Sequence, residues 1–238
     1  YNAATARLYE DVGVFTADEE IAADVADLFN HLTGFGRPQR FHKLLVAPFA
    51  MRARLVDEIR RVAAAAAAGE PTRIRLKLNQ LVDPTIIDEL YAASQAGVPI
   101  EICARAICML RAGVPGLSET IRVRSLFGRF LEHSRIYFFE APSASTCYLG
   151  SADLMPRNLD RRIEVLTPVE SARVRQELGA VLDSVFADTT NVWELTPDDT
   201  WSRAATGEGA RPHTHQAFMQ RRALARARRR ADTRGRTP

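Results

Sequence analysis

The sequence has little cysteine and no long apolar run, and each shortage excludes a class of protein. Its three cysteines, Cys103, Cys108 and Cys147, are an odd number and lack the paired spacing of metal ligands. We therefore expect neither a disulfide scaffold nor a zinc site, and a reducing cytoplasm fits this cysteine usage. A membrane span needs about 20 uncharged apolar residues. The longest uninterrupted run of small apolar residues, the alanines at 63–68, is much shorter and suits a helix. Peripheral association with a membrane surface stays open.

The chain also lacks an initiating methionine and the charged and apolar regions of a signal peptide. It begins at Tyr1, and its first residues, YNAATARLYEDVGVFT, already look like the inside of a domain. We therefore expect the sequence to be a fragment of a longer protein. Its 238 residues, 46% hydrophobic and 26% charged, are typical of one sizeable globular domain, or one domain and a piece of another.

Positive charge is concentrated at one end of the chain. Residues 211–238 contain nine arginines and one acid, Asp232, for a net charge of +8. Residues 1–210 contain 23 basic and 28 acidic residues, a net charge of −5, so the total is +3. The pI near 9.0 therefore belongs to the tail, and the body gives no reason to expect specific binding of nucleic acid.

The first 40 residues predict a helix that precedes a domain boundary. The helix begins near Asp18 with Thr16 as its cap, and apolar side chains then recur at helical spacing up to Leu32. Gly34, Gly36 and Pro38 end it. We place the boundary at residue 40.

Residues 41–195 predict an α/β sandwich. The expected strands are residues 43–48, 74–78, 99–104, 121–123, 134–140, 145–150 and 162–168, and the expected helices are residues 50–68, 84–96 and 171–186. The alternation of strands and helices in the first half indicates parallel strands with crossover helices, hence a mixed, largely parallel sheet flanked by helices. Residues 196–238 lose this periodicity and predict a basic, mobile tail.

Polar side chains follow several of these strands. Asn79, Arg105 and the Ser151–Asp153 stretch come directly after strand ends, and ligands bind at the carboxyl ends of strands in α/β sheets. His133 immediately precedes a strand and stands two residues before Arg135. A group that titrates near neutral pH beside a fixed cation suits phosphoryl transfer. This spacing is similar to the His-x-Lys half-motif of phospholipase-D-like phosphotransferases.

Six stretches resemble bacterial polyphosphate kinase of the first family, in the same order and spacing. They are TARLYED at residues 5–11, LKLNQLVD at 76–83, LYAASQAG at 90–97, VPGLSETIRVR at 114–124, FLEHSRIY at 130–137 and GSADLMPRNLDRRIE at 150–164. The resemblance spans roughly residues 1–195, the C-terminal part of that enzyme. It implies that residues 1–40 end one phospholipase-D-like domain and that residues 41–195 are the final one, with both contributing to one active site.

The resemblance implies reversible transfer of the terminal phosphate of ATP to polyphosphate through a phosphohistidine, with Mg²⁺ as cofactor. Tyr9 matches the tyrosine that stacks on adenine, Arg105 and Arg162 match phosphate-binding arginines, and His133 matches a histidine proposed as general acid/base. The nucleophilic histidine and the groups that hold Mg²⁺ match no residue here and belong upstream, so no metal ligand is expected in this chain and the chain alone is expected to be inactive. The full-length enzyme is expected to be a homo-oligomer. Ala106 and Pro156 depart from the family pattern.

Two other functions remain open. The first is a non-catalytic module that binds polyphosphate or RNA through its arginines and basic tail. The second is a phospholipase-D-like hydrolase, which is disfavoured because only one half-motif is present and its cation is Arg135. The remaining histidines and cysteines have structural rather than functional interpretations. We expect Cys103 and Cys108 to be packing residues, and His213 and His215 to belong to a solvated tail rather than to a metal pair. His31 and His42 have no catalytic neighbours in the sequence.

Overall fold

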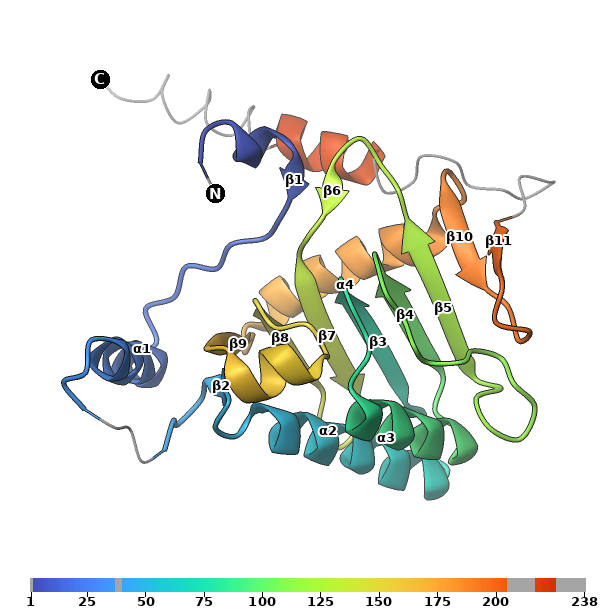
Figure 1. The fold of residues 1–238 in the computed structure, drawn as a ribbon, viewed down its shortest axis with the longest axis horizontal. Helices are drawn as coiled ribbons and strands as arrows, with labels where there is room; N and C mark the ends of the chain where they lie inside the picture. Colours follow the sequence, from blue (N-terminus) through green and yellow to red (C-terminus); the bar gives the residue numbers. More distant parts are fainter. Residues whose placement is uncertain (1, 37–39, 205–216, 226–238) are drawn as a thin grey trace.

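A nine-stranded sheet dominates the computed structural model, which describes residues 2–36, 40–204 and 217–225 (Figure 1). Its strand order is β11-β10-β5-β4-β3-β7-β8-β9-β2. In chain order the strands are β2 (Leu45–Ala47), β3 (Arg73–Leu78), β4 (Ile100–Ala104), β5 (Ile121–Leu126), β7 (Arg135–Glu140), β8 (Thr146–Gly150), β9 (Glu164–Pro168), β10 (Val192–Leu195) and β11 (Trp201–Arg203). A separate parallel pair joins β1 (Tyr9–Glu10) to β6 (Leu131–Glu132).

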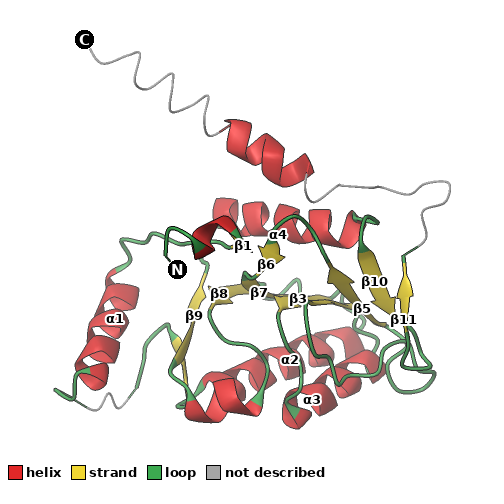
Figure 2. Cartoon of the chain, turned by 45° about the horizontal axis from the view of Figure 1, so that its top comes forward, coloured by secondary structure: helices red, strands yellow, loops and turns green. Residues whose placement is uncertain are grey.

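Helices cover both faces of the sheet, as Figure 2 shows. Helices α2 (Met51–Ala67) and α3 (Pro84–Gln95) pack on one face, and α4 (Ala172–Ala187) packs on the other. On β7 the side chains alternate accordingly: Tyr137 and Phe139 point to the α2 face, and Ile136 and Phe138 point to the α4 face. The remaining helical segments are η1 (Thr5–Arg7), α1 (Glu19–Leu32), the π-helical turn η2 (Arg157–Arg161) and residues 217–225.

The predicted α/β sandwich with a mixed sheet is confirmed, but its parallel part is smaller than expected. Only β3, β4 and β5 pair in parallel within the sheet, and the other six pairings in it are antiparallel. The reason lies in the connections. Helix α3 provides a crossover between the adjacent strands β3 and β4, whereas α2 connects β3 to β2, which pairs with β9 at the far edge of the sheet. Short connections join the antiparallel neighbours β7–β8 and β10–β11, whereas β3 with β7 and β5 with β10 pair over long stretches of chain.

Two local predictions also need correction. Asp18, not Thr16, caps α1, because its carboxylate accepts a hydrogen bond from the Ile21 amide at 2.9 Å. The sheet continues past residue 195 into β11, where the sequence predicted the start of the tail. The hairpin of β10 and β11 adds two strands beside β5. No helix among the described residues has the length and apolar character needed to cross a membrane.

Candidate active site at one end of the sheet

The polar residues that follow the strands meet at one end of the sheet, which we call the His133 edge. It is formed by the last residues of β3, β4, β5 and β8 and the first residues of β7 and β9, because Arg135 pairs with Gly150 and Gly150 with Leu166 in antiparallel register. The sequence predicted this convergence for Asn79, Arg105 and Asp153, and the structure confirms it.

Asp153 organises the His133 edge from a buried position. Its side chain is 8% exposed and accepts a hydrogen bond from the Asn79 amide at 2.8 Å and two from the guanidinium of Arg135, at 3.3 and 3.4 Å. The loop that holds it is fixed by Tyr137, whose hydroxyl donates to the Ala152 carbonyl at 2.6 Å. Asp153 therefore orients both an amide and a cation toward the same edge.

Arg105 is oriented by a neighbouring strand. Its Nε donates to Oδ1 of Asn79 at 2.8 Å, which leaves the rest of the guanidinium in a shallow cleft of about 330 Å³. The cleft is also lined by Phe127, Trp193 and Trp201. Neither tryptophan was singled out from the sequence, because the β10–β11 hairpin that brings them here gave no periodic signal.

His133 lies between a cation and an anion. Nη1 of Arg135 is 3.0 Å from each ring nitrogen of His133 and donates to its carbonyl at 2.7 Å. Oδ2 of Asp11 lies 3.3 Å from Nδ1. Burial lowers the pKa of His133 below its usual 6.5 and the charge of Arg135 lowers it further, while Asp11 opposes the shift. The imidazole is therefore mostly neutral at pH 7 and able to accept a proton.

Tyr9 reaches His133 from the start of the chain. The two rings meet edge to face, with centroids 5.0 Å apart and planes at 71°. A cavity of about 560 Å³, large enough for a nucleotide-sized molecule, opens beside Tyr9 and Asp11 and continues along Phe127 and Phe130. Asp11 was missed by the sequence analysis, since no local pattern links it to a residue 122 positions away.

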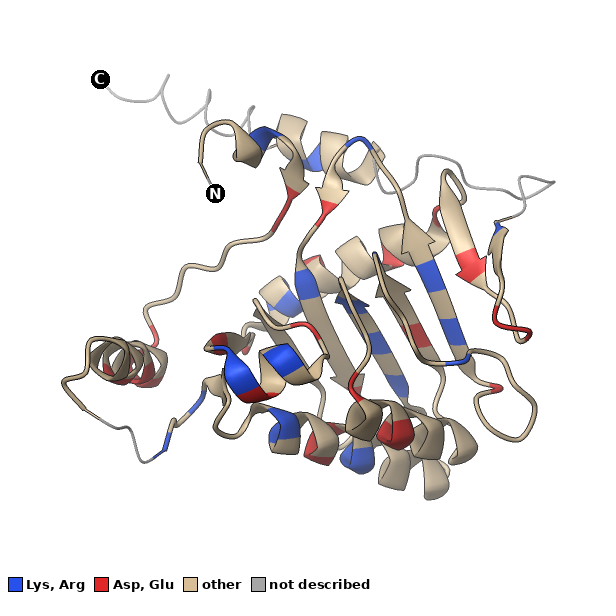
Figure 3. Cartoon of the chain, in the orientation of Figure 1, with Lys and Arg blue, Asp and Glu red and all other residues tan. Residues whose placement is uncertain are grey.

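Arg162 lies at the same edge but is engaged differently. It follows η2, its side chain is 52% exposed, and it forms an ion pair with Glu164, with Nη1 3.8 Å from Oε1. Pro156 is the N-cap of η2, and the Ala106 amide donates to the Asn79 carbonyl at 2.8 Å, so both departures from the family pattern sit in ordered backbone. Figure 3 shows basic positions on either side of an acidic one in η2.

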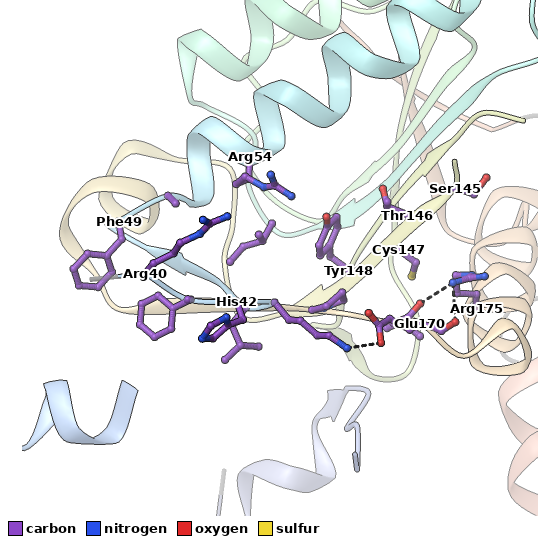
Figure 4. Close-up of a pocket in the computed structure, with 17 residues that line it drawn as sticks. Arg40, His42, Phe49, Arg54, Ser145, Thr146, Cys147, Tyr148, Glu170 and Arg175 are labelled. Carbon is purple, nitrogen blue, oxygen red and sulfur yellow. Dashed lines mark hydrogen bonds and ion pairs between the residues drawn. The ribbon is translucent and has the colours of Figure 1, made fainter. Parts of the chain in front are cut away.

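A second cavity, of about 530 Å³, lies at the opposite end of β8, beside Thr146 rather than Gly150 (Figure 4). We call it the Arg54 cavity, after one of the cations that line it. Arg175 points into it but donates to the Glu170 carbonyl at 2.8 Å, and Lys43 is paired with the Glu170 carboxylate at 2.9 Å. The site predicted from the sequence is not here.

The other sequence candidates have structural partners or lie outside the described residues. Cys103 and Cys147 are buried and Cys108 is half-buried, all three as free thiols, which agrees with packing roles. His31 contacts the ring of Phe49, with centroids 5.3 Å apart. His213 and His215, and most of the tail arginines, lie outside the described residues.

Comparison with known proteins places this geometry in a family. Residues 1–38 match the family described as polyphosphate kinase C-terminal domain 1, and residues 44–216 match polyphosphate kinase C-terminal domain 2. The chain belongs to the polyphosphate kinase family. The match spans both the segment with Tyr9 and the segment with His133, as the resemblance predicted.

Known polyphosphate kinases extend well beyond this chain. It is 48% identical over 212 residues to polyphosphate kinase of Streptomyces coelicolor, which covers 89% of the chain and 28% of the relative. Polyphosphate kinase of Mycobacterium tuberculosis is 50% identical over 226 residues, which covers 93% of the chain and 30% of the relative. The chain thus spans less than a third of these relatives.

A solved structure supports the fold assignment. The crystal structure of polyphosphate kinase from Porphyromonas gingivalis matches 89% of this chain and 32% of that chain, with a TM-score of 0.81 and 33% identity. A phospholipase D family member from Salmonella typhimurium has a TM-score of 0.39 and 15% identity, a likeness too weak to bear on function.

Proposed function

We propose that this chain is the C-terminal part of an enzyme that reversibly transfers the terminal phosphate of ATP to polyphosphate. The observation that supports this most is the set of groups at the His133 edge: a mostly neutral histidine held against Arg135 and Asp11, with Arg105 facing the same edge. Phosphoryl transfer depends on positioning and on fixed positive charge more than on covalent chemistry by the protein.

Each predicted side chain has a role that its geometry permits. Arg105 and Arg162 would bind phosphate oxygens, since guanidinium groups match phosphate geometry and keep their charge. Tyr9 would stack on adenine in the adjoining cavity. His133 would act as general acid/base, donating a proton to the oxygen of ADP as the bond to the terminal phosphorus breaks and taking one up in the reverse direction.

The bound substrate would itself tune His133. Burial, and then the charges of Arg135 and Arg105, lower the pKa of His133 in the unliganded chain. Phosphate oxygens bound to Arg105 would offset that positive field, so the pKa of His133 would rise when nucleotide binds. The imidazole would then hold a proton in the complex, as a general acid requires.

The nucleophile and the metal come from elsewhere in this proposal. We propose that the phosphohistidine forms on a residue upstream of Tyr1 and that the chain alone is inactive. Among the described residues, no cluster of three or more His, Cys, Asp or Glu side chains is arranged to hold a metal ion. We propose Mg²⁺ as cofactor with ligands upstream, and a cytoplasmic homo-oligomer as the full-length enzyme.

The test is a chimera in which this chain replaces the matching C-terminal segment of Mycobacterium tuberculosis polyphosphate kinase. Incorporation of the γ-phosphate of radiolabelled ATP into polyphosphate, and the reverse reaction with ADP, would be measured against the parent enzyme. We expect transfer in both directions, and no phosphohistidine on the isolated chain. A folded chimera without transfer would refute the proposed function.

A further inference from the structure

A buried cation lies directly behind the candidate site and contacts both segments that form it. Lys77, on β3, is 2% exposed. Its Nζ is 2.9 Å from Oε2 of Glu10, 3.0 Å from Oε2 of Glu132 and 2.7 Å from the hydroxyl oxygen of Ser134. We call Lys77, Glu10, Glu132 and Ser134 the Lys77 cluster. Lys77 alternates with Leu76 and Leu78, a pattern typical of the exposed face of a half-buried strand, but the structure buries it.

The carboxylates of the Lys77 cluster stand next to the two rings of the site. Glu10 follows Tyr9 on β1, and Glu132 precedes His133 at the end of β6. Figure 3 shows acidic segments where β1 and β6 end. Oε2 of Glu10 also accepts hydrogen bonds from the backbone amides of His133 and Ser134, at 3.3 and 3.4 Å. One carboxylate thus binds the backbone of His133 and belongs to the residue next to Tyr9.

The cluster also joins the two family segments. Tyr9 and Glu10 lie in residues 1–38, which match one domain of the family, whereas Lys77 and residues 131–134 lie in the other. The pairing of β1 with β6 is only two residues long, so its ladder alone is a weak link. Three contacts from one buried ammonium supply a specific register for it.

Lys77 and Glu10 shift each other's pKa in opposite directions. Burial acts to raise the pKa of Glu10, but the charge and hydrogen bond of Lys77 outweigh it and lower that pKa to about 2. Burial likewise acts to lower the pKa of Lys77, and the two carboxylates outweigh it and raise it. Glu10 and Lys77 are therefore both ionised at neutral pH and form a buried ion pair. Ionised groups gathered in a water-excluded site are costly and fix a geometry where they are well paired.

We propose that the Lys77 cluster is a latch between the two family segments that sets the position of Tyr9 against His133. Lys77, Glu10 and Glu132 are positioning residues. The expected effect of the latch on turnover rests on the proposed function. The same buried groups would keep Tyr9, which would stack on the nucleobase, at a fixed position relative to His133, which would transfer the proton.

Glu10→Ala is the variant of choice, because it removes the contact between Lys77 and β1 and leaves the ion pair of Lys77 with Glu132. Lys77→Met removes the contacts to both Glu10 and Glu132, but it leaves their buried carboxylates without a counter-charge, which would destabilise the fold. Arg75→Met is the matched control. Arg75 lies two residues earlier on the same face of β3, is 6% exposed, and is bound to Glu140 and Asp183, far from the His133 edge.

The first measurement needs neither ATP nor turnover. Nuclear Overhauser effects between the ring protons of Tyr9 and His133 would be recorded in the 238-residue chain with selectively labelled tyrosine and histidine. We expect the effect in the parent chain and in Arg75→Met, and its loss in Glu10→Ala. A folded Glu10→Ala chain that keeps the effect would overturn the latch, whatever the fate of the proposed function.

The second measurement is steady-state kinetics in the chimera. A displacement on the scale of 1 Å costs about 100-fold in rate, so we expect kcat/KM for ATP to fall by about that factor in Glu10→Ala, with KM raised as well as kcat lowered. A purely structural role would reduce the active fraction and leave KM unchanged, as expected for Arg75→Met. Unchanged KM in Glu10→Ala, or an equal rise in both variants, would overturn the proposal.

Discussion

The two ends of β7 and β8 differ in how deeply their ion pairs are buried. At the His133 edge, both members of an ion pair are buried, as in Asp153 with Arg135 and Lys77 with Glu10. At the Arg54 cavity, Lys43 is shared by three exposed or half-exposed carboxylates and Arg175 donates to nearby carbonyls. Exposed pairs contribute little, whereas buried charges are costly and concentrate where function requires them. This difference in burial supports the proposed site at the His133 edge without reference to cavity size.

The largest expected effect is on phosphoryl transfer after Arg105→Gln in the chimera. Removing a preorganised cation from a phosphoryl transition state lowers kcat by about 100-fold or more. Arg54→Gln, at the other end of the sheet, is the matched control and should leave kcat unchanged. Radiolabel incorporation into polyphosphate measures both. Equal losses in the two variants would remove the functional difference between the two ends.

The next effect is on stability, through Asp153→Asn. The change leaves Arg135 without its buried counter-charge, and breaking such a pair costs about 3 kcal/mol. Glu170→Gln removes a carboxylate that is 58% exposed at the Arg54 cavity, and we expect a cost under about 1 kcal/mol. Denaturant unfolding of the 238-residue chain checks both values. A smaller cost for Asp153→Asn than for Glu170→Gln would contradict the comparison.

The smallest effect is on the titration of His133. Because burial and then Arg135 lower its pKa from 6.5, and Asp11 opposes them, Arg135→Gln should raise the pKa and Asp11→Asn should lower it further. The folded chain binds the proton less readily than the unfolded chain, so His133 reduces stability as pH falls through 6.5 and below, and not above it. Histidine NMR titration measures the shifts, and shifts of the reverse sign would refute this electrostatic account.

The elements of the sheet could be predicted from sequence because their signals are local. Helices α2, α3 and α4 and most strands lie within a few residues of their predicted bounds, since apolar spacing and cap residues such as Asp83 are readable over short windows. The clustering of Asn79, Arg105 and Asp153 followed from strand ends alone.

What could not be predicted depends on long-range pairing. Lys77 alternates with apolar residues and so predicts an exposed position, but α4 and the β1–β6 pair cover that face. Asp11 and His133 meet only because Tyr9 pairs with Leu131, and Trp201 reaches Arg105 only through the β10–β11 hairpin. No local pattern encodes these contacts, because each joins short strands distant in sequence.

The most direct test of the account is the protection of histidines by ATP in the chimera. Diethylpyrocarbonate modifies neutral imidazoles, and mass spectrometry resolves its rate at His133, whose side chain is 25% exposed, from that at His42 beside the Arg54 cavity. The account predicts that saturating ATP slows modification of His133 and leaves His42 unaffected. Protection of His42 with His133 unchanged would place the nucleotide at the wrong end of the sheet and contradict the account.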